Sequence, residues 1–232
     1  MPKTFTTWTV LPHEPTEKIA DNLWRVEGHL GTTQRQMVLA RDAKGDVTVH
    51  NAIALDEPEM KALDAWGRVA VIFVPNGLHR QDARIWKDRY PEAKVVAPAG
   101  ARKKIASIVP VDATCEDAPR DETLTLHALD GCPGEGVLEV HSGDDTTLVF
   151  CDALLNQPVR GGIWGFFLAP TGRPSVPRIV RWMGMKNRAA LASHLDRLAA
   201  TPGLRRVLVG HGKPIDVDPG AALRTAATDL RG

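Results

Sequence analysis

The chain has 232 residues, of which 43% are hydrophobic and 25% charged. This composition excludes an intrinsically disordered protein and a small disulfide-dependent one. Lys and Arg number 29 against 28 Asp and Glu, a formal net charge of +1, so bulk charge gives no reason to bind nucleic acid or a membrane, although this sum does not exclude a local patch. We expect one domain over residues 1–232, with neither nucleic acid nor membrane as partner.

The cysteines and the N-terminus indicate a reducing compartment. Cys115, Cys132 and Cys151 form no Cys-x-x-Cys pair and are odd in number, which argues against a disulfide framework. The first twenty residues carry Lys and Glu and lack the apolar core of a signal peptide. The longest charge-free run, residues 161–172, is too short to cross a bilayer. We therefore expect a cytoplasmic protein.

The first half of the chain is dominated by short strands. Runs rich in Val, Thr and Trp, interrupted by Gly, predict strands at residues 5–10, 22–27, 36–40 and 47–50. A short amphipathic helix follows Asp56 and ends at Gly67. The continuous apolar run 69–74 predicts a strand buried on both faces, and a helix at 82–90 and a strand at 95–97 complete a β-α-β unit.

The second half predicts strands at 124–128, 136–141, 146–151 and 206–209, and helices at 188–200 and 219–230. Strands grouped into meanders, with helices after some of them, favour an α/β (α+β) fold in which two sheets lie between outer helices, a four-layer αββα sandwich. Residues 156–185 hold aromatic side chains without a steady period. This long insert forms either a lid over a site or, slightly favoured, a segment packed on the body or a second subunit.

Several predicted strands end in residues that bind metals. His79 and Asp82 follow the strand at 69–74, Asp152 follows the strand at 146–151, and His211 follows the strand at 206–209. A further strand ends at His50. Strand ends in layered α/β folds meet at one edge, and imidazole and carboxylate suit zinc, iron or manganese. No His-x-His or His-Glu-x-x-His motif supports these residues.

Several short motifs occur in a characteristic order along the chain. They are Asn22-Leu23-Trp24-Arg25-Val26, Pro75 to Asp82, Gly131-Cys132-Pro133-Gly134, Val149-Phe150-Cys151-Asp152 and Val209-Gly210-His211-Gly212. This order resembles the metallo-β-lactamase-like superfamily over most of the chain, and in particular a divergent, poorly characterised branch with no established activity. The resemblance implies an αββα sandwich with a metal site at one edge, which usually serves hydrolysis by a metal-bound hydroxide.

The resemblance is incomplete at the metal ligands. Metal-binding members have His-x-His-x-Asp-His where this chain has the stretch 76–82, so only His79 and Asp82 are counterparts. Gly131 stands where the family has a histidine before Thr-Pro-Gly. The bridging aspartate falls on Asp152 and the last histidine on His211. The resemblance thus implies a degenerate, at most mononuclear site.

Two functions remain open from the sequence. In the first, His79, Asp152 and His211 hold one divalent metal, either zinc, iron or manganese, and the protein hydrolyses an ester, thioester or similar bond of a small molecule, with His50 or Asp82 assisting. In the second, the protein holds no metal and is a binding or regulatory module. For Asp82, capping of the following helix is the favoured role, and for His50 a hydrogen-bonded structural role. A homo-oligomer is compatible with either function.

Overall fold

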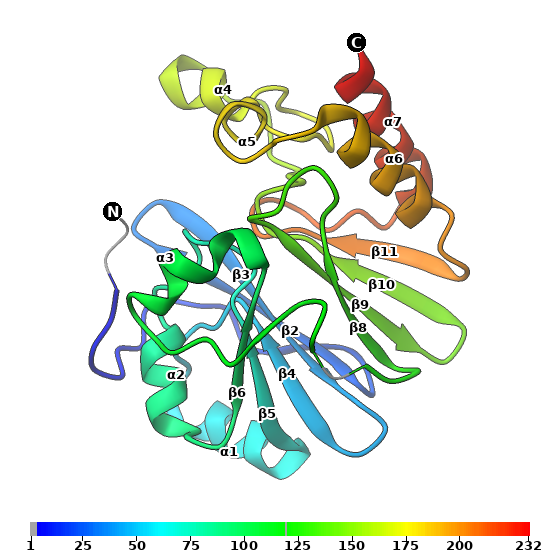
Figure 1. Ribbon diagram of the computed structural model, residues 1–232. Coiled ribbons are helices and arrows are strands. Elements are labelled where there is room, and N and C mark those ends of the chain that lie inside the picture. The colour runs from blue at the N-terminus through cyan, green and yellow to red at the C-terminus, as the bar shows by residue number, and fades with distance from the viewer. Residues whose placement is uncertain (1–3, 119) are drawn as a thin grey trace.

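The larger of two sheets begins as an antiparallel meander and continues in parallel. In the computed structural model, which describes residues 4–118 and 120–232, this sheet has seven strands in chain order (Figure 1). β1 to β4 pair antiparallel, and β4 to β7 pair parallel, which requires crossover connections. The strands are β1 (Glu17–Ala20), β2 (Leu23–Leu30), β3 (Thr33–Arg41), β4 (Asp46–His50), β5 (Arg68–Phe73), β6 (Lys94–Ala97) and β7 (Ala113–Thr114).

The smaller sheet has four strands in the order β11-β10-β9-β8. β8 and β10 pair antiparallel with β9, and β11 pairs parallel with β10. The parallel pairing places the carboxyl ends of β10 and β11 side by side at one edge. The strands are β8 (Leu124–Ala128), β9 (Gly136–Ser142), β10 (Asp145–Val149) and β11 (Leu204–Leu208).

Helices cover the outer face of each sheet (Figure 1). The larger sheet is covered by α1 (Glu57–Trp66), α2 (Ala83–Arg89) and α3 (Arg102–Ala106), the last preceded by the turn η1 (Ala99–Ala101). The smaller sheet is covered by α6 (Arg188–Ala199) and α7 (Pro219–Arg231). α1, α6 and α7 begin at Asp56, Asn187 and Asp218, whose side chains each accept a hydrogen bond from the first turn.

Three buried clusters separate the four layers. Ile72 of β5 packs with Met60 and Trp86 of the helices, whereas the next residue, Phe73, packs between the sheets with residues of β8 and β9. This alternation along one strand is the period-two pattern of a sheet buried on both faces. A third cluster joins Phe150 to residues of α6 and α7. The predicted αββα sandwich is therefore confirmed.

Some predicted elements differ from the structure. The strand predicted at 5–10 is wrong, since these residues form no strand and the first one is β1. The aromatic residues of this segment pack on the helix layer instead, with Phe5 buried and Trp8 5.6 Å from the Trp86 ring. The insert at 156–185 contains two short helices, α4 (Gly162–Leu168) and α5 (Arg178–Met183). Among the described residues, no helix is both long and apolar enough to span a bilayer.

Candidate metal centre

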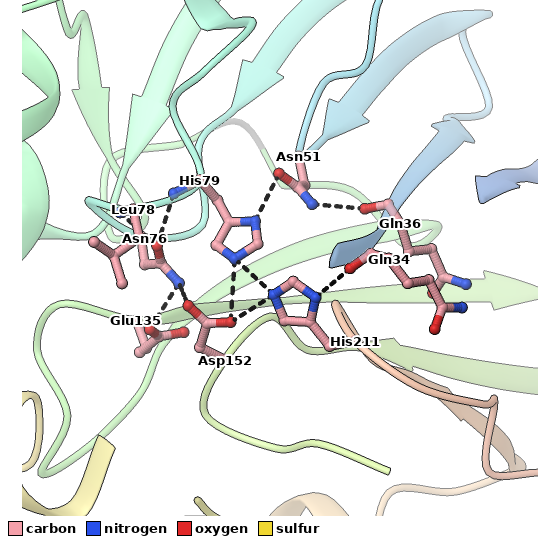
Figure 2. A network of polar contacts seen from close by, with 9 residues as sticks. All are labelled: Gln34, Gln36, Asn51, Asn76, Leu78, His79, Glu135, Asp152 and His211. Atoms are coloured by element: carbon pink, nitrogen blue, oxygen red, sulfur yellow. Dashed lines mark hydrogen bonds and ion pairs between the residues drawn. The ribbon is translucent and has the colours of Figure 1, made fainter. Parts of the chain in front are cut away.

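The structure brings together three of the residues predicted from strand ends. His79 comes from the turn between β5 and α2, Asp152 follows β10 and His211 follows β11 (Figure 2). His79 Nε2 lies 3.1 Å from Asp152 Oδ1, and His211 Nε2 lies 3.3 Å from the same oxygen. The two Nε2 atoms are 3.2 Å apart. Three potential ligand atoms thus converge on one point.

The partner of His79 determines its tautomer. His79 Nδ1 lies 3.1 Å from Oδ1 of Asn51, while Nδ2 of the same amide donates to the Gln36 carbonyl at 2.7 Å (Figure 2). This second bond fixes which amide atom faces the histidine. Because an amide oxygen only accepts, His79 carries its hydrogen on Nδ1. Its Nε2 then presents a lone pair to Asp152 and His211.

His211 is held in the same way from the opposite side. Its Nδ1 donates to the backbone carbonyl of Gln34 in β3, and a carbonyl has no hydrogen to give. Neutral His211 therefore also presents a lone pair at Nε2. A carboxylate oxygen and two imidazole lone pairs repel one another at this spacing, and either a proton on one ring nitrogen or a metal cation among the three atoms relieves the repulsion. Second contacts of this kind to the distal ring nitrogen are typical of metal-ligating histidines.

The spacing of the three atoms fits one ion. Tetrahedral zinc with bonds of about 2.0–2.1 Å separates its ligand atoms by roughly 3.3–3.4 Å, close to the 3.1, 3.2 and 3.3 Å observed. Two nitrogens and one carboxylate oxygen also form a common catalytic zinc set. Within residues 4–118 and 120–232, no other group of three or more His, Cys, Asp or Glu ligand atoms lies this close together.

The charges of the site are strongly coupled. Burial alone would raise the pKa of Asp152, but the charges and hydrogen bonds of His79 and His211 outweigh it and hold this pKa well below its usual range. Burial would lower the pKa of His211, but the hydrogen bond and charge of Asp152 and the bond to the Gln34 carbonyl raise it. The charge of Asp152 therefore favours the protonated form of His211.

Asn76 and Glu135 support the site from one side, and nothing in the sequence indicated Glu135. Asn76 Nδ2 donates to Asp152 Oδ2 at 2.9 Å and to Glu135 Oε1 at 2.8 Å. Asn76 Oδ1 accepts from the backbone N–H groups of Leu78 and His79. Burial, and then the charge of Asp152, raises the pKa of Glu135 well above its usual range. Only the turn-forming position of Asn76 after a buried strand is visible in the sequence.

Gly131, where the resemblance implies a histidine, leaves no room for a side chain. Its φ is 74°, and an added Cβ would lie 2.0 Å from the Asn187 carbonyl oxygen. A histidine here requires the start of α6 to move. Leu78, two residues after Asn76, is partly exposed and offers no ligand atom.

Asp82 does not join the three ligand atoms. Its buried carboxylate forms an ion pair with buried Arg35 and accepts from the backbone N–H of Ala54 at 3.2 Å. Burial raises the pKa of Asp82 against the opposing effect of Arg35. The expected capping role is wrong, because Asp82 precedes α2 without a side-chain bond to it. The assisting role predicted for Asp82 has no geometric support.

His50 also remains outside the group of ligand atoms. It lies at the end of β4 with 1% of its surface exposed, and its ring edge faces Phe73. Neither ring nitrogen hydrogen-bonds to a described residue, so the expected hydrogen-bonded structural role is wrong. Burial and then the charge of His79 lower the pKa of His50 to about 3. The ring is therefore neutral and enclosed.

The cysteines near the site are unreactive thiols. Cys132 and Cys151 are buried, and burial raises the pKa of Cys132 to about 12 and that of Cys151 well above its usual value. Since the thiolate is the nucleophilic form, neither thiol is ionised near neutral pH.

Comparisons with known proteins identify the fold. No model of a protein family matches the chain, and no curated protein matches it significantly. Solved structures do match, among them VMB-1 (TM-score 0.63, 11% identity, 94% of this chain and 97% of the other). The DIM-1 metallo-β-lactamase matches with a TM-score of 0.63 and 14% identity over 95% of this chain and 99% of its own. A metallo-β-lactamase from Hirschia baltica matches with a TM-score of 0.61 and 12% identity over 93% of this chain and 98% of its own. The chain therefore has a metallo-β-lactamase-like fold.

Proposed function

We propose that this protein is a metal-dependent hydrolase, built as one metallo-β-lactamase-like domain, with a single divalent ion held by His79, Asp152 and His211. The observation that carries the proposal is the convergence of two imidazole lone pairs on one carboxylate oxygen at 3.1–3.3 Å. Such a group is incomplete without a cation. Zinc, manganese and iron are the candidates, because imidazole and carboxylate suit all three.

The chemistry follows from what such an ion supplies. A bound divalent metal polarises a carbonyl and lowers the pKa of a coordinated water. The residues of the chain orient this site, with Asn51 and Gln34 fixing the two imidazoles and Asn76 fixing the carboxylate. The side chains of Asp152 and His211 are each 15% exposed, so a small substrate reaches the site from solvent. An ester, thioester or similar bond is the proposed target.

A single ion is favoured over two. The second oxygen of Asp152, the atom that would bridge to another metal, accepts from Asn76 instead. Asn76 and Leu78, which precede His79, supply no imidazole, and Gly131 stands where the resemblance implies a further histidine. A catalytic zinc needs about three protein ligands and one open position. His79, Asp152 and His211 are enough ligands for one such ion and too few for two.

Metal content tests this proposal directly. Protein purified without chelator is expected to carry close to one equivalent of divalent metal by elemental analysis, and Asp152→Asn to carry almost none. Less than a tenth of an equivalent, with no change in melting after zinc or manganese is added, would contradict the hydrolase and favour the metal-free binding module. A panel of chromogenic ester and thioester substrates then identifies the bond cleaved, with Asp152→Asn as the inactive control.

Three expectations stay predictions from the sequence. They are the cytoplasmic location, the small-molecule substrate without a nucleic acid partner, and compatibility with a homo-oligomer. Size-exclusion chromatography with light scattering measures the last of these on the purified chain.

A further inference from the structure

The segment between Asp152 and Asp196 is strongly basic. It contains no Asp or Glu at all, although the whole chain has a net charge of only +1. A balanced total therefore conceals a local excess of positive charge next to the candidate site. The basic residues of the segment are Arg160, Arg173, Arg178, Arg181, Lys186 and Arg188.

The same segment exposes most of the large apolar side chains on the surface. Of nine such exposed residues in the described part of the chain, six lie here, each more than half exposed. Soluble proteins rarely leave so many large apolar groups together in water unless a partner covers them. The six are Val159, Ile163, Trp164, Phe166, Trp182 and Met183, which we call the apolar patch.

The apolar patch is an ordered structure rather than a loose loop. Trp182 of α5 packs against Phe166 and Phe167 of α4, with ring centroids 5.8 and 6.2 Å away. The Arg178 guanidinium lies over the rings of Phe166 and Trp182 and donates to the Phe166 carbonyl. None of these rings belongs to a buried core cluster. Helices α4 and α5 thus hold one another at the end of the molecule, beyond both sheets (Figure 1).

Basic residues gather beside the apolar patch. Burial first lowers the pKa of Arg181, and the charges of Arg188, Arg173 and Arg178 lower it further, so these side chains lie near one another. Asp229 of α7 opposes this effect and pairs with Arg173 at 2.7 Å. Lys186 and Arg188 are exposed to solvent. A positive surface therefore adjoins the exposed aromatic rings.

We propose that the apolar patch and its basic residues bind the surface of an anionic lipid bilayer, in contrast to the expectation from the net charge that a membrane is not a partner. Trp and Phe favour the boundary between headgroups and acyl chains, and Arg and Lys are attracted to anionic headgroups. A second copy bound through the same patch would bring like charges together, which disfavours it. A nucleic acid would leave the aliphatic Ile163, Val159 and Met183 uncovered, since bases stack on rings.

The position of the patch relates it to the candidate metal centre. The segment leaves the smaller sheet beside His211, where the Asn156 N–H donates to the His211 carbonyl and the Asn156 carbonyl accepts from Lys213. Arg160, a few residues further on, is close enough to act on His211 through its charge. Residues 156–159 therefore connect the candidate site to the apolar patch along the chain.

Vesicle sedimentation with the full-length protein tests the proposal. At low salt the protein is expected to sediment with vesicles of phosphatidylcholine and phosphatidylglycerol and to stay in solution with phosphatidylcholine alone. Raising the salt should release it, because screening weakens the charge attraction. Equal sedimentation with both vesicle types, or none with either, overturns the proposal.

Two double variants locate the contact. Lys186→Gln/Arg188→Gln is expected to weaken partitioning at least tenfold, since each basic residue near an anionic surface contributes about fivefold. Trp164→Ser/Trp182→Ser should also weaken it. Exposed Val217→Ser and Arg205→Gln are matched controls that should bind like the wild type. If both double variants bind as well as these controls, the proposal fails, whatever the metal content. Self-association through the patch without vesicle binding also overturns it.

Discussion

Two carboxylates that follow strands of different sheets have opposite surroundings. Asp82 forms an ion pair with Arg35, so the chain neutralises this charge itself. Asp152 faces two histidines whose distal nitrogens are already committed to Asn51 and Gln34, and no Arg or Lys side chain of the described residues pairs with it. A buried charge balanced within the chain serves the fold, whereas one that needs a cation from outside indicates function. The following experiments test this distinction.

The largest effect is expected at the ion pair. Asp82→Asn leaves Arg35 as an unpaired buried charge, which costs about 3–5 kcal/mol and lowers the melting temperature by roughly 6–20 °C. Metal content should not change, because Asp82 lies outside the ligand group. The exposed pair Arg84–Asp88 is the control, and Asp88→Asn should cost under about 1 kcal/mol. Loss of metal from Asp82→Asn that is still folded would show that Asp82 also contributes to metal binding, and would contradict the distinction between the two carboxylates.

Added metal is expected to have the next largest effect. Free zinc at one hundred times its dissociation constant stabilises the folded protein by about 2.7 kcal/mol, a rise of roughly 5–10 °C in melting temperature. Differential scanning fluorimetry measures the shift, which Asp152→Asn should abolish. His141→Gln, which removes a histidine elsewhere, should keep it. An equal shift in Asp152→Asn would place the zinc at another site.

Removing the partner of His79 should weaken metal binding without removing a ligand. Asn51→Gly frees Nδ1, and loss of such a contact lowers metal affinity by about 10- to 100-fold. Glycine suits the position because the φ of Asn51 is 55°. Asn51→Asp, which keeps an acceptor, should restore much of the affinity. Competition with a chromogenic chelator measures all three proteins, and equal affinities would show that the tautomer is not held by Asn51.

The effect expected at His50 depends on pH and is the smallest of the four near neutral pH. The pKa of His50 is lowered from 6.5 to about 3 in the folded protein, so the unfolded chain binds more protons between these values. Stability from this group is therefore present above about pH 6.5 and declines as the pH falls towards 3, by up to about 1.4 kcal/mol per pH unit. In urea denaturation of the metal-free proteins, the free energy of unfolding of His50→Leu should decline less with falling pH than that of the wild type. Parallel curves for the two proteins would contradict this assignment.

The sequence predicted the three side chains that converge better than it predicted their surroundings. His79, Asp152 and His211 were found because each follows an apolar run, and buried strands of this kind end at a common edge. Asn51 and Gln34 carry no comparable signal, since their contacts to His79 and His211 join distant parts of the chain. For Asp82 the sequence suggested a role at the site, because its spacing from His79 resembled the family motif. No sequence pattern indicated its ion pair with Arg35, which is 47 residues away.

Composition and local pattern determined the layers of this protein. Apolar runs have to be buried on both faces, and amphipathic helices on one, so the αββα arrangement follows from periodicity. The number of positive charges also follows from the sequence. The basic residues and aromatic rings of the patch lie in one segment, so the sequence already places them together. The exposure of those rings, and the orientation of two lone pairs towards one carboxylate, were decided only by the tertiary structure. The lone pairs depend on hydrogen bonds between residues far apart in the chain, which local pattern does not encode.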